Sequence, residues 1–467
     1  MEQRLVTAAR NAVADPSPLP LYRRLAEALS AQLTQAAPPV LPPARRLAAR
    51  VGLNRATVTA AYRELARQGL TELRPGRPRG QDRGALPEPE TGGPEVEPPP
   101  GAHDLARYAP NRELLPGGAV FRWLGFGEGE GEGVAQYGTV WGHPPLRKWV
   151  ASRLAGLGIP VETDGLLLTS GVQHALDLVF RALAQAGDGI LVEDPAYPGL
   201  PPLLATHRVR PLSVPIHPDG LHPEDVFRAV RRRSPRMAII TPTLHNPSGV
   251  VLGADERREI VGCLQGAGVL VVEEYFDPAL VAEGPVPPPM AALSQGVIVV
   301  GSFSKALFPG LRVGWVAGPP AVVRRLAAVK RATDLSGSPF LEAAAWSLCN
   351  RGVLEDQLGR LRREALRRRQ VVFEALDRTM QPGFRWSRPR GGFSLLVFLP
   401  AGTSSRAVAN RAARAGSWVL PGPLMSVSGR DDVLRVAYAA HGGATLRQGM
   451  HHVISALEGV AHEVPLV

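Results

Sequence analysis

Three observations predict a chain of two domains: an N-terminal helical domain that ends in a β-hairpin, and a C-terminal α/β domain with a largely parallel sheet. The chain has 467 residues, which is more than one hydrophobic core usually organises. Residues 1–84 contain fourteen Arg against six Asp or Glu, so most of the net charge of +11 lies in the first fifth of the chain. From Asp104 onward, short apolar strands alternate with helical stretches.

The composition excludes several other classes of protein. With 45% hydrophobic and 20% charged residues, the chain has the material for a large core and is not disordered. It contains no apolar run of about 18 residues, and its first residues lack the apolar segment of a signal peptide, so we expect no membrane span. Its two cysteines cannot form a disulfide framework or a zinc site of cysteines. We therefore expect a cytoplasmic protein, and we expect no metal site.

The N-terminal domain is predicted to span residues 1–83 and to begin with an amphipathic helix over residues 18–36. Apolar side chains recur there three and four positions apart: Tyr22, Leu25, Leu29 and Leu33. Two further helices follow a proline-rich break at residues 38–43. Gly52 fits the C-terminal end of the first of them, and Asn54 fits the N-cap of the second.

The last of these helices separates a buried face from an exposed one. The buried stripe consists of the side chains at positions i, i+4 and i+7: Val58, Tyr62 and Leu65. The side chains left for solvent or DNA are Arg55, Thr57, Thr59 and Arg63. A DNA-recognition helix needs this division, because its N-terminal turn must face the groove. The positive charge by itself is equally consistent with a solvated basic face.

A basic hairpin and a stiff linker complete the N-terminal part. Residues 70–83 combine a short apolar strand, a Pro-Gly turn and four arginines, which predicts a hairpin wing. Residues 85–102 contain six prolines and four glutamates without a basic residue, which predicts an acidic linker. We therefore place the linker at residues 84–103 and the α/β domain at residues 104–467.

The first 80 residues resemble the winged helix-turn-helix domain of the GntR family of regulators. The likeness extends over the opening helix, the core of residues 41–70 and the arginine-rich wing. The resemblance implies binding to double-stranded DNA, with contacts to phosphates and base edges from four residues: Arg45, Arg55, Thr57 and Arg77. The proline-rich stretch before Arg45 is shorter than in the family, so the geometry of that turn departs from the pattern.

Lysine is rare in this chain, which draws attention to each one. Of the 53 Lys and Arg residues, only three are lysine: Lys148, Lys305 and Lys330. A lysine amine forms an imine with an aldehyde, whereas an arginine does not. Lys305 follows an apolar strand in the segment 301–315, and Ser302, Ser304 and Arg312 lie close to it in the sequence. These hydroxyls and this guanidinium are the groups that a phosphorylated aldehyde requires.

Segment 301–315 resembles the lysine signature of fold type I aminotransferases, in which the lysine bonds covalently to pyridoxal phosphate. Segment 166–184 is predicted to be a strand followed by a helix, and it resembles the phosphate-binding turn of the same family. A helix N-terminus with a glycine suits a phosphate, and the residues there are Ser170, Gly171 and Val172. The resemblance implies that these three residues bind the cofactor together with Lys305, Ser302, Ser304 and Arg312.

Three further positions match residues of the same family. Tyr197 matches the aromatic side chain that lies over the pyridine ring, although an ordinary loop tyrosine is the alternative. Asn246 matches the asparagine next to the cofactor's phenolic oxygen. Arg435 matches the arginine that grips a substrate carboxylate, which implies an effector like an amino acid; an arginine paired within the small domain is the alternative. Residues 137–150 resemble a segment near the active site or the dimer contact.

The acidic position of the predicted cofactor site departs from the family. The family has an aspartate that pairs with the pyridine nitrogen and a tyrosine shortly after it. Glu274 and Phe276 fit these positions, and a slip by one residue gives Glu273 and Tyr275 instead. A glutamate still supplies the counter-charge, but its extra methylene changes the reach. We therefore expect cofactor binding with weakened or altered catalysis, in which no more than a half-reaction of an aminotransferase remains.

The order of the parts resembles the MocR subfamily of regulators, in which a GntR-type domain and a linker precede an aminotransferase-like domain with a small C-terminal α/β part. The resemblance implies a homodimer, commonly head-to-tail, in which cofactor or ligand binding changes how two DNA-binding heads address their sites. The sequence thus predicts a regulator of vitamin B6 or amino-acid metabolism that depends on pyridoxal phosphate.

Other functions stay open at this point. PdxR-like sensing of the vitamer is favoured over GabR-like sensing of γ-aminobutyrate, because Gly199 stands where the latter is expected to carry an arginine. One alternative is a working aminotransferase with an accessory DNA-binding head. Another is a regulator whose cavity no longer binds pyridoxal phosphate.

Overall fold

The chain divides into two compact units, residues 1–92 and residues 93–467. The structure is a computed structural model. It describes residues 2–14, 17, 19–33, 41–67, 71–72, 79–80, 98–99, 101–116, 134–378 and 383–461. The predicted DNA contact Arg77 and most of the predicted linker lie outside these residues. Among the described residues, no helix combines the length and the apolar character that a membrane crossing needs.

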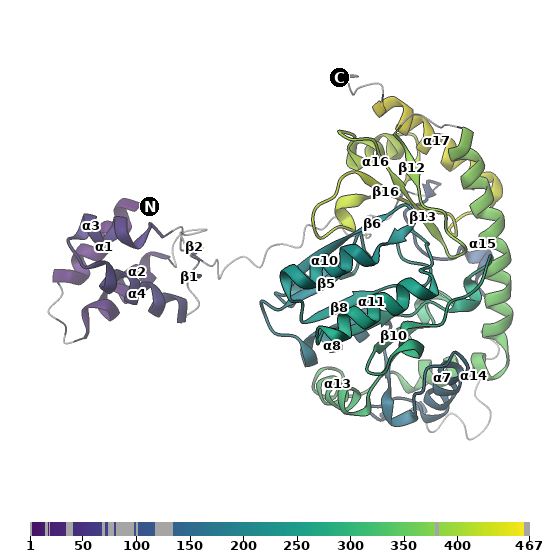
Figure 1. The fold of residues 1–467 in the computed structure, drawn as a ribbon, viewed down its shortest axis with the longest axis horizontal. Helices are drawn as coiled ribbons and strands as arrows, with labels where there is room; N and C mark the ends of the chain where they lie inside the picture. Colours follow the sequence, from purple (N-terminus) through teal and green to yellow (C-terminus); the bar gives the residue numbers. More distant parts are fainter. Residues whose placement is uncertain are drawn as a thin grey trace. The chain divides into compact units, whose positions relative to one another are not determined.

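The described part of the first unit consists of four helices and a two-stranded antiparallel ribbon (Figure 1). These elements are α1 (Glu2–Ala14), α2 (Leu21–Leu33), α3 (Ala44–Val51), α4 (Arg55–Arg67), β1 (Thr71–Glu72) and β2 (Arg79–Gly80). Helix α2 corresponds to the first predicted helix. Helix α1 was not predicted; it packs against α2 through the buried side chains of Leu5, Ala9 and Ala12, two of which are too small to mark an apolar stripe.

The boundary between α3 and α4 follows the predicted signals. Gly52 ends α3 in the left-handed conformation, with φ at 74°, which glycine adopts without strain. The Asn54 side chain accepts a hydrogen bond from the Ala56 backbone N–H at 2.8 Å, as an N-cap does. The predicted buried stripe of α4 is confirmed, and the Tyr62 hydroxyl donates to the Pro42 carbonyl at 2.8 Å. This bond fixes α4 against the segment that precedes α3.

An eight-stranded mixed sheet forms the centre of the second unit. Its strands, in spatial order, are β4 (Leu166–Thr169), β11 (Gly314–Ala317), β10 (Ile298–Ser302), β9 (Leu270–Glu274), β8 (Met237–Ile240), β5 (Gly189–Asp194), β6 (Arg210–His217) and β7 (Gly220–Leu221). The five strands from β10 to β6 run parallel, and the pairings of β4, β11 and β7 are antiparallel. The prediction of a largely parallel sheet holds for the centre. Strand β6 was not predicted because it contains Pro211 and Pro215, which usually mark turns or edges.

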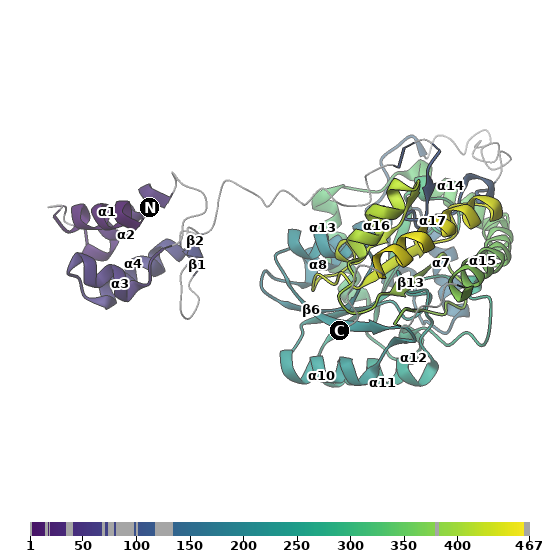
Figure 2. The same cartoon turned by 90° about the horizontal axis from the view of Figure 1, so that it is seen from above.

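Helices cover both faces of this sheet. On one face lie α8 (Val172–Leu183), α9 (Leu200–Thr206) and α13 (Pro320–Thr333). On the other lie α7 (Pro144–Gly156), α10 (Pro223–Arg233), α11 (Ala254–Gly266), α12 (Met290–Leu293), α14 (Pro339–Asn350) and the start of α15 (Val353–Arg378). Figure 2 shows α10, α11 and α12 on the side of the sheet away from α8 and α13. A hydrophobic core lies on each face of the sheet. Alternate residues of a strand belong to different cores, because successive side chains of a strand point to opposite faces.

A small antiparallel sheet forms the C-terminal part of the second unit. Its strands, in order, are β12 (Arg385–Trp386), β13 (Ser394–Phe398), β16 (Val433–Ala437) and β15 (Leu420–Pro421). Helices α16 (Ser405–Arg414), α17 (Gly443–Ala461) and the end of α15 pack on it. A short parallel pair, β3 (His103–Asp104) with β14 (Ser417–Trp418), joins the start of the unit to this part. Short 3-10 turns occupy Arg112–Leu114, Thr163–Gly165, Pro278–Leu280, Pro309–Leu311 and Gly422–Leu424.

Candidate functional site

A cavity lies where the parallel strands β5, β8, β9 and β10 end. The carboxyl ends of parallel strands share one edge of the sheet, and open α/β folds bind ligands there. The residues that line the cavity are Val172, Gln173, Tyr197, Asn246, Glu274, Tyr275, Phe276, Asp277, Leu280, Ser302, Ser304, Lys305, Ala306 and Arg312. Tertiary folding has thus gathered most of the residues that the sequence singled out, from segments more than a hundred positions apart.

The amine of Lys305 points into this cavity from the turn after β10. Its Nζ donates to the Tyr108 carbonyl at 2.6 Å and lies 5.1 Å from the centre of the Tyr108 ring. Burial, with the nearby positive charge of Arg435, lowers the pKa of this amine to about 8. The Ser304 hydroxyl is buried without a hydrogen-bond partner. The site therefore holds an amine that loses its proton readily and a hydroxyl that can accept a new contact.

The two neighbouring glutamates of β9 have separate environments. Glu274 lines the cavity, and its Oε2 accepts a hydrogen bond from the Thr241 hydroxyl at 3.3 Å. Glu273 instead accepts from the Ala291 backbone N–H at 3.0 Å, away from the cavity. Burial raises the pKa of both carboxyl groups to about 7. The alternation of the strand therefore places Glu274, and not Glu273, with Lys305.

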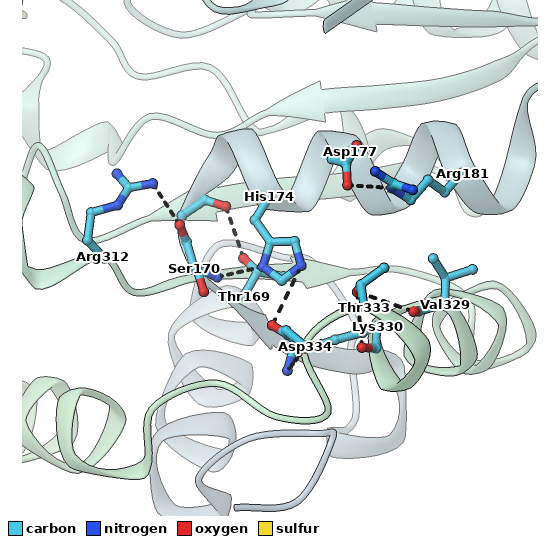
Figure 3. A network of polar contacts seen from close by, with 11 residues as sticks. Thr169, Ser170, His174, Asp177, Arg181, Arg312, Val329, Lys330, Thr333 and Asp334 are labelled. Carbon is cyan, nitrogen blue, oxygen red and sulfur yellow. Dashed lines mark hydrogen bonds and ion pairs between the residues drawn. The ribbon is translucent and has the colours of Figure 1, made fainter. Parts of the chain in front are cut away.

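The N-terminus of α8 meets Arg312 at the rim of the cavity (Figure 3). Arg312 donates to the Ser170 carbonyl at 2.8 Å. Gly171 has φ at 95°, and a Cβ there would lie 3.1 Å from the Arg312 guanidinium. Ser170 and Gly171 thus hold Arg312 beside the helix N-terminus, while Val172 lines the cavity itself. A helix N-terminus with an adjacent guanidinium attracts a phosphate.

A chain of polar contacts continues from this turn to the C-terminal end of α13 (Figure 3). The Ser170 backbone N–H donates to His174 Nδ1 at 3.1 Å, and His174 Nε2 lies 3.8 Å from Asp334. Asp334 also lies 3.2 Å from the amine of Lys330, whose side chain is fully buried. Lys330, one of the three lysines, therefore has a structural partner and lies outside the cavity.

The remaining predicted residues take different positions. Tyr197 lines the cavity, and burial raises the pKa of its hydroxyl to about 12. Arg435 is buried and donates to Asn246 Oδ1 at 3.1 Å and to the Ala106 carbonyl at 2.6 Å. Its guanidinium lies 5.2 Å from the Tyr108 ring. Two of the N–H donors of Arg435 therefore bond to other groups of the protein.

Sequence reasoning missed Tyr108, Thr241 and Glu193. Tyr108 contacts Lys305 through its carbonyl and both Lys305 and Arg435 through its ring. Thr241 bonds Glu274 through its hydroxyl and Glu193 through its backbone N–H. None of the three belongs to a segment with a spacing signal, so only their spatial neighbours identify them.

In the first unit, the predicted DNA contacts Arg45 and Arg55 are exposed and Thr57 is half-buried. Arg55 and Thr57 lie on the first turns of α4, and Arg45 lies on the first turn of α3. The three residues therefore lie near the N-terminal ends of two helices that pack against each other.

The structure contains one cluster of possible metal ligands among its described residues, where the sequence predicted none. It consists of His217, His222 and Asp225, close to the start of α10. The two imidazole rings stack 4.1 Å apart with their planes 16° from parallel, and each binds a carboxylate: His217 contacts Asp225 at 2.8 Å and His222 contacts Asp219 at 2.9 Å. The possible ligand atoms of the three residues lie within 4.8 Å of one another, and both rings already contact carboxylates beside the α10 N-terminus.

We expect Gly171→Ala to weaken ligand binding at this turn. The substitution places a Cβ against Arg312 and forces alanine into a backbone region that costs about 1–3 kcal/mol. Titration with pyridoxal phosphate should give a dissociation constant raised about tenfold, because the turn and Arg312 both shift. Gly262→Ala is the matched control, since a Cβ on that α11 glycine meets nothing within 4 Å. Equal affinity in both variants would show that the turn does not bind the ligand.

Comparisons with known proteins agree with this geometry. Residues 119–453 match the family model described as aminotransferase class I and II. A 2-aminoadipate transaminase of Thermus thermophilus is 30% identical over 343 residues, which cover 71% of this chain and 83% of that protein. The HTH-type transcriptional regulator YisV of Bacillus subtilis is 28% identical over 82% of this chain and 84% of its own length. A probable rhizopine catabolism regulatory protein of Rhizobium meliloti, MocR, is 28% identical over 77% of this chain and 78% of its own.

One solved structure extends the comparison to three dimensions. LysN, the α-aminoadipate aminotransferase of Thermus thermophilus, was crystallised in complex with N-(5'-phosphopyridoxyl)-L-leucine. It superimposes with a TM-score of 0.72 at 29% identity, over 78% of this chain and 94% of that one. The similar relatives thus include both aminotransferases and regulators.

Proposed function

The chain belongs to the aminotransferase class I and II family, and from this premise we propose that it is a MocR-type transcription regulator whose second unit binds pyridoxal phosphate and whose first unit binds DNA. The observation that carries the proposal is the cavity around Lys305, in a chain that matches an HTH-type regulator over 82% of its length. The first unit adds the basic helix pair that a plain aminotransferase does not need.

Pyridoxal phosphate is the cofactor that the family and the phosphopyridoxyl compound in LysN indicate. The residues present fit it. Gly171 lets the Arg312 guanidinium approach the N-terminus of α8 closely, since a Cβ there would lie 3.1 Å from it, and this combination suits the phosphate. The unpartnered Ser304 hydroxyl and the amine of Lys305 face the same cavity. Glu274 supplies the carboxylate for the ring nitrogen.

Each residue has a distinct task at this site. When bound, the cofactor supplies an aldehyde that reacts with amines and a ring that withdraws electrons. Lys305 would hold it covalently, and the lowered pKa of this amine keeps a fraction of it neutral at neutral pH. Arg312 and the α8 N-terminus would neutralise the phosphate, and Tyr197 would pack beside the ring. The Glu274 carboxylate would stabilise a proton on the ring nitrogen.

Two residues bear on which molecule is sensed. Arg435 donates to Asn246 and to the Ala106 carbonyl, and its buried Nε has no hydrogen-bond partner, so it keeps a donor for an effector carboxylate. Gly199, however, lacks the guanidinium that a GabR-like sensor of γ-aminobutyrate is expected to carry at this position. We therefore infer a sensor of vitamin B6 status, in which cofactor binding biases one arrangement of the DNA-binding units by its differential affinity for the two.

We expect Arg55→Ala to weaken DNA binding and to lower its salt dependence. The side chain is exposed on the first turn of α4, and loss of one phosphate contact reduces the slope of log K against log salt by about 1. Fluorescence anisotropy with duplex DNA from upstream of the chain's own gene measures both quantities. Arg367→Ala, an equally charged change at an exposed position of the second unit, is the control. If the two variants bind alike, the first unit does not read DNA through α4.

The proposal includes a homodimer. Among the described residues of the second unit, four large apolar side chains are exposed: Tyr137, at 90%, and Val286, Leu335 and Phe340. Tyr137 and Leu335 line one hollow. Exposed apolar side chains that gather in one place mark protein contacts, so this face supports association with a second copy, which sedimentation of the full chain measures.

A working aminotransferase is the second candidate. The 30% identity to a 2-aminoadipate transaminase favours it, as does the complete set of amine, carboxylate and phosphate-binding groups. A steady-state assay with a panel of amino and keto acids separates the two candidates. Turnover at ordinary aminotransferase rates would support the enzyme and contradict the expected weak catalysis.

A further inference from the structure

Two buried glutamates contact the same threonine. Glu193 lies on β5 and Glu274 on β9, and Thr241 directly follows β8, the strand between them. The Thr241 backbone N–H donates to Glu193 Oε2 at 2.9 Å, and the Thr241 hydroxyl donates to Glu274 Oε2 at 3.3 Å. The exposed fractions of the two glutamates are 3% and 6%. One residue therefore connects the cavity carboxylate to a second carboxyl group that the cavity does not contain.

The groups around Glu193 provide no cation for it. His245 Nε2 lies 3.4 Å from Glu193 Oε2, but burial lowers the pKa of this imidazole to about 3, so it is neutral. Its Nδ1 contacts the Ser248 hydroxyl at 2.8 Å. The adjacent Asp194 turns away and accepts from the Ser428 backbone N–H. Among the described residues, no arginine or lysine forms an ion pair with Glu193.

The groups around Glu274 differ, because a cation is present. Lys305 lies in the same cavity, and its charge opposes the effect of burial on the pKa of Glu274. Burial raises the pKa of Glu193 further, to about 8, and the negative charge of Glu274 contributes to this shift. Two close buried carboxyl groups with a cation on one side ionise one at a time. The charge therefore resides on Glu274 and the proton on Glu193.

We propose that Glu193 and Thr241 are positioning residues for Glu274. Glu193 is protonated, which leaves Glu274 as the single carboxylate of the pair, and the Thr241 hydroxyl orients the Glu274 carboxylate toward the ring nitrogen of the cofactor. The idea rests on the proposed binding of pyridoxal phosphate. It also accounts for the glutamate in place of the aspartate, since the hydrogen bond from Thr241 fixes the additional rotatable bond. Glu193, Thr241 and Glu274 together thus determine which of the two carboxyl groups carries the proton and which carries the negative charge that faces the ring.

The first test uses the cofactor-free protein, so that it does not depend on cofactor binding. A carboxyl whose folded pKa is raised from its usual 4.5 to about 8 stabilises the fold at low pH, and this contribution disappears as the pH rises through about 8. Glu193→Gln does not titrate. We expect its melting temperature, relative to the unmodified chain, to rise by several degrees between about pH 5 and pH 8.5. Parallel pH curves for the two proteins would overturn the protonated state of Glu193.

The second test uses the cofactor as a spectroscopic probe. We expect Glu193→Gln to keep the visible spectrum of bound pyridoxal phosphate at neutral pH and to remove its change near pH 8. Thr241→Val should shift the apparent pKa of the pH titration that is followed in the visible spectrum. Thr241→Ser, which keeps the hydroxyl, should restore the apparent pKa of the unmodified chain. If Thr241→Val and Thr241→Ser behave alike, the hydroxyl does not aim Glu274. If neither the unmodified chain nor any of the variants binds the cofactor, the proposed function is wrong. The melting curves would still decide whether Glu193 is protonated.

Discussion

We expect Lys305→Ala to abolish the covalent attachment of pyridoxal phosphate that we propose for this chain. The amine of Lys305 is the one lysine amine of the described residues that lines the cavity; Lys148 is exposed on α7 and Lys330 is paired with Asp334 in the core. Arginine cannot replace it in this reaction. Mass spectrometry after borohydride reduction should therefore find a cofactor adduct of one per chain in the unmodified protein and none in the variant.

The same experiment has a pH dependence with a definite sign. The pKa of Lys305 is lowered to about 8, so the neutral amine that reacts with an aldehyde becomes more abundant as the pH rises from about 7 to 9. Attachment should accordingly become faster over this range and then level off. Lys148→Ala is the control and should retain the full adduct. An adduct on Lys305→Ala, or its absence from the unmodified chain, would remove the basis of the proposed sensor.

We expect Arg257→Met to destabilise the second unit by about 3–5 kcal/mol. Arg257 lies on α11 and is fully buried. It donates five hydrogen bonds, four of them to the backbone carbonyls of Pro242, Leu252, Pro287 and Pro288 and one to the Thr243 hydroxyl. Methionine fills a similar volume but leaves these acceptors without a donor, and each unsatisfied buried group costs about 1–3 kcal/mol.

The loss of Arg257 also reaches the candidate site. Pro242, Thr243 and Leu252 belong to the loop that carries Asn246, so that loop loses its anchor when the guanidinium is removed. Thermal unfolding followed by near-UV circular dichroism measures the stability of the unit. Arg258→Met, one residue along the same helix and exposed, should leave the melting temperature almost unchanged. A melting temperature of Arg257→Met equal to that of this control would show that the five bonds do not stabilise the fold.

Local signals explain why part of the structure could be predicted. The boundary at Gly52 and Asn54 depends on backbone conformation and on a side chain bonding two residues away, which a sequence displays directly. The buried stripe of Val58, Tyr62 and Leu65 follows from helical periodicity. The strand that leads to Lys305 is an apolar run with a polar end. Strand β6 was not predicted, because its two prolines are typical of turns and edges, although this strand pairs with β5 on one side and β7 on the other.

The sequence by itself determined helices α2 to α4, most of the parallel strands at the centre of the sheet and most of the chemical groups that line the cavity, since each depends on neighbours within a few positions. The tertiary structure decided which of the adjacent glutamates joins Lys305, because the pleat of β9 sends successive side chains to opposite faces. It also decided that Glu193, Thr241 and Glu274 meet, and that Arg435 bonds Asn246 from 189 positions away. Such contacts arise from the order of strands in the sheet, which no local pattern encodes.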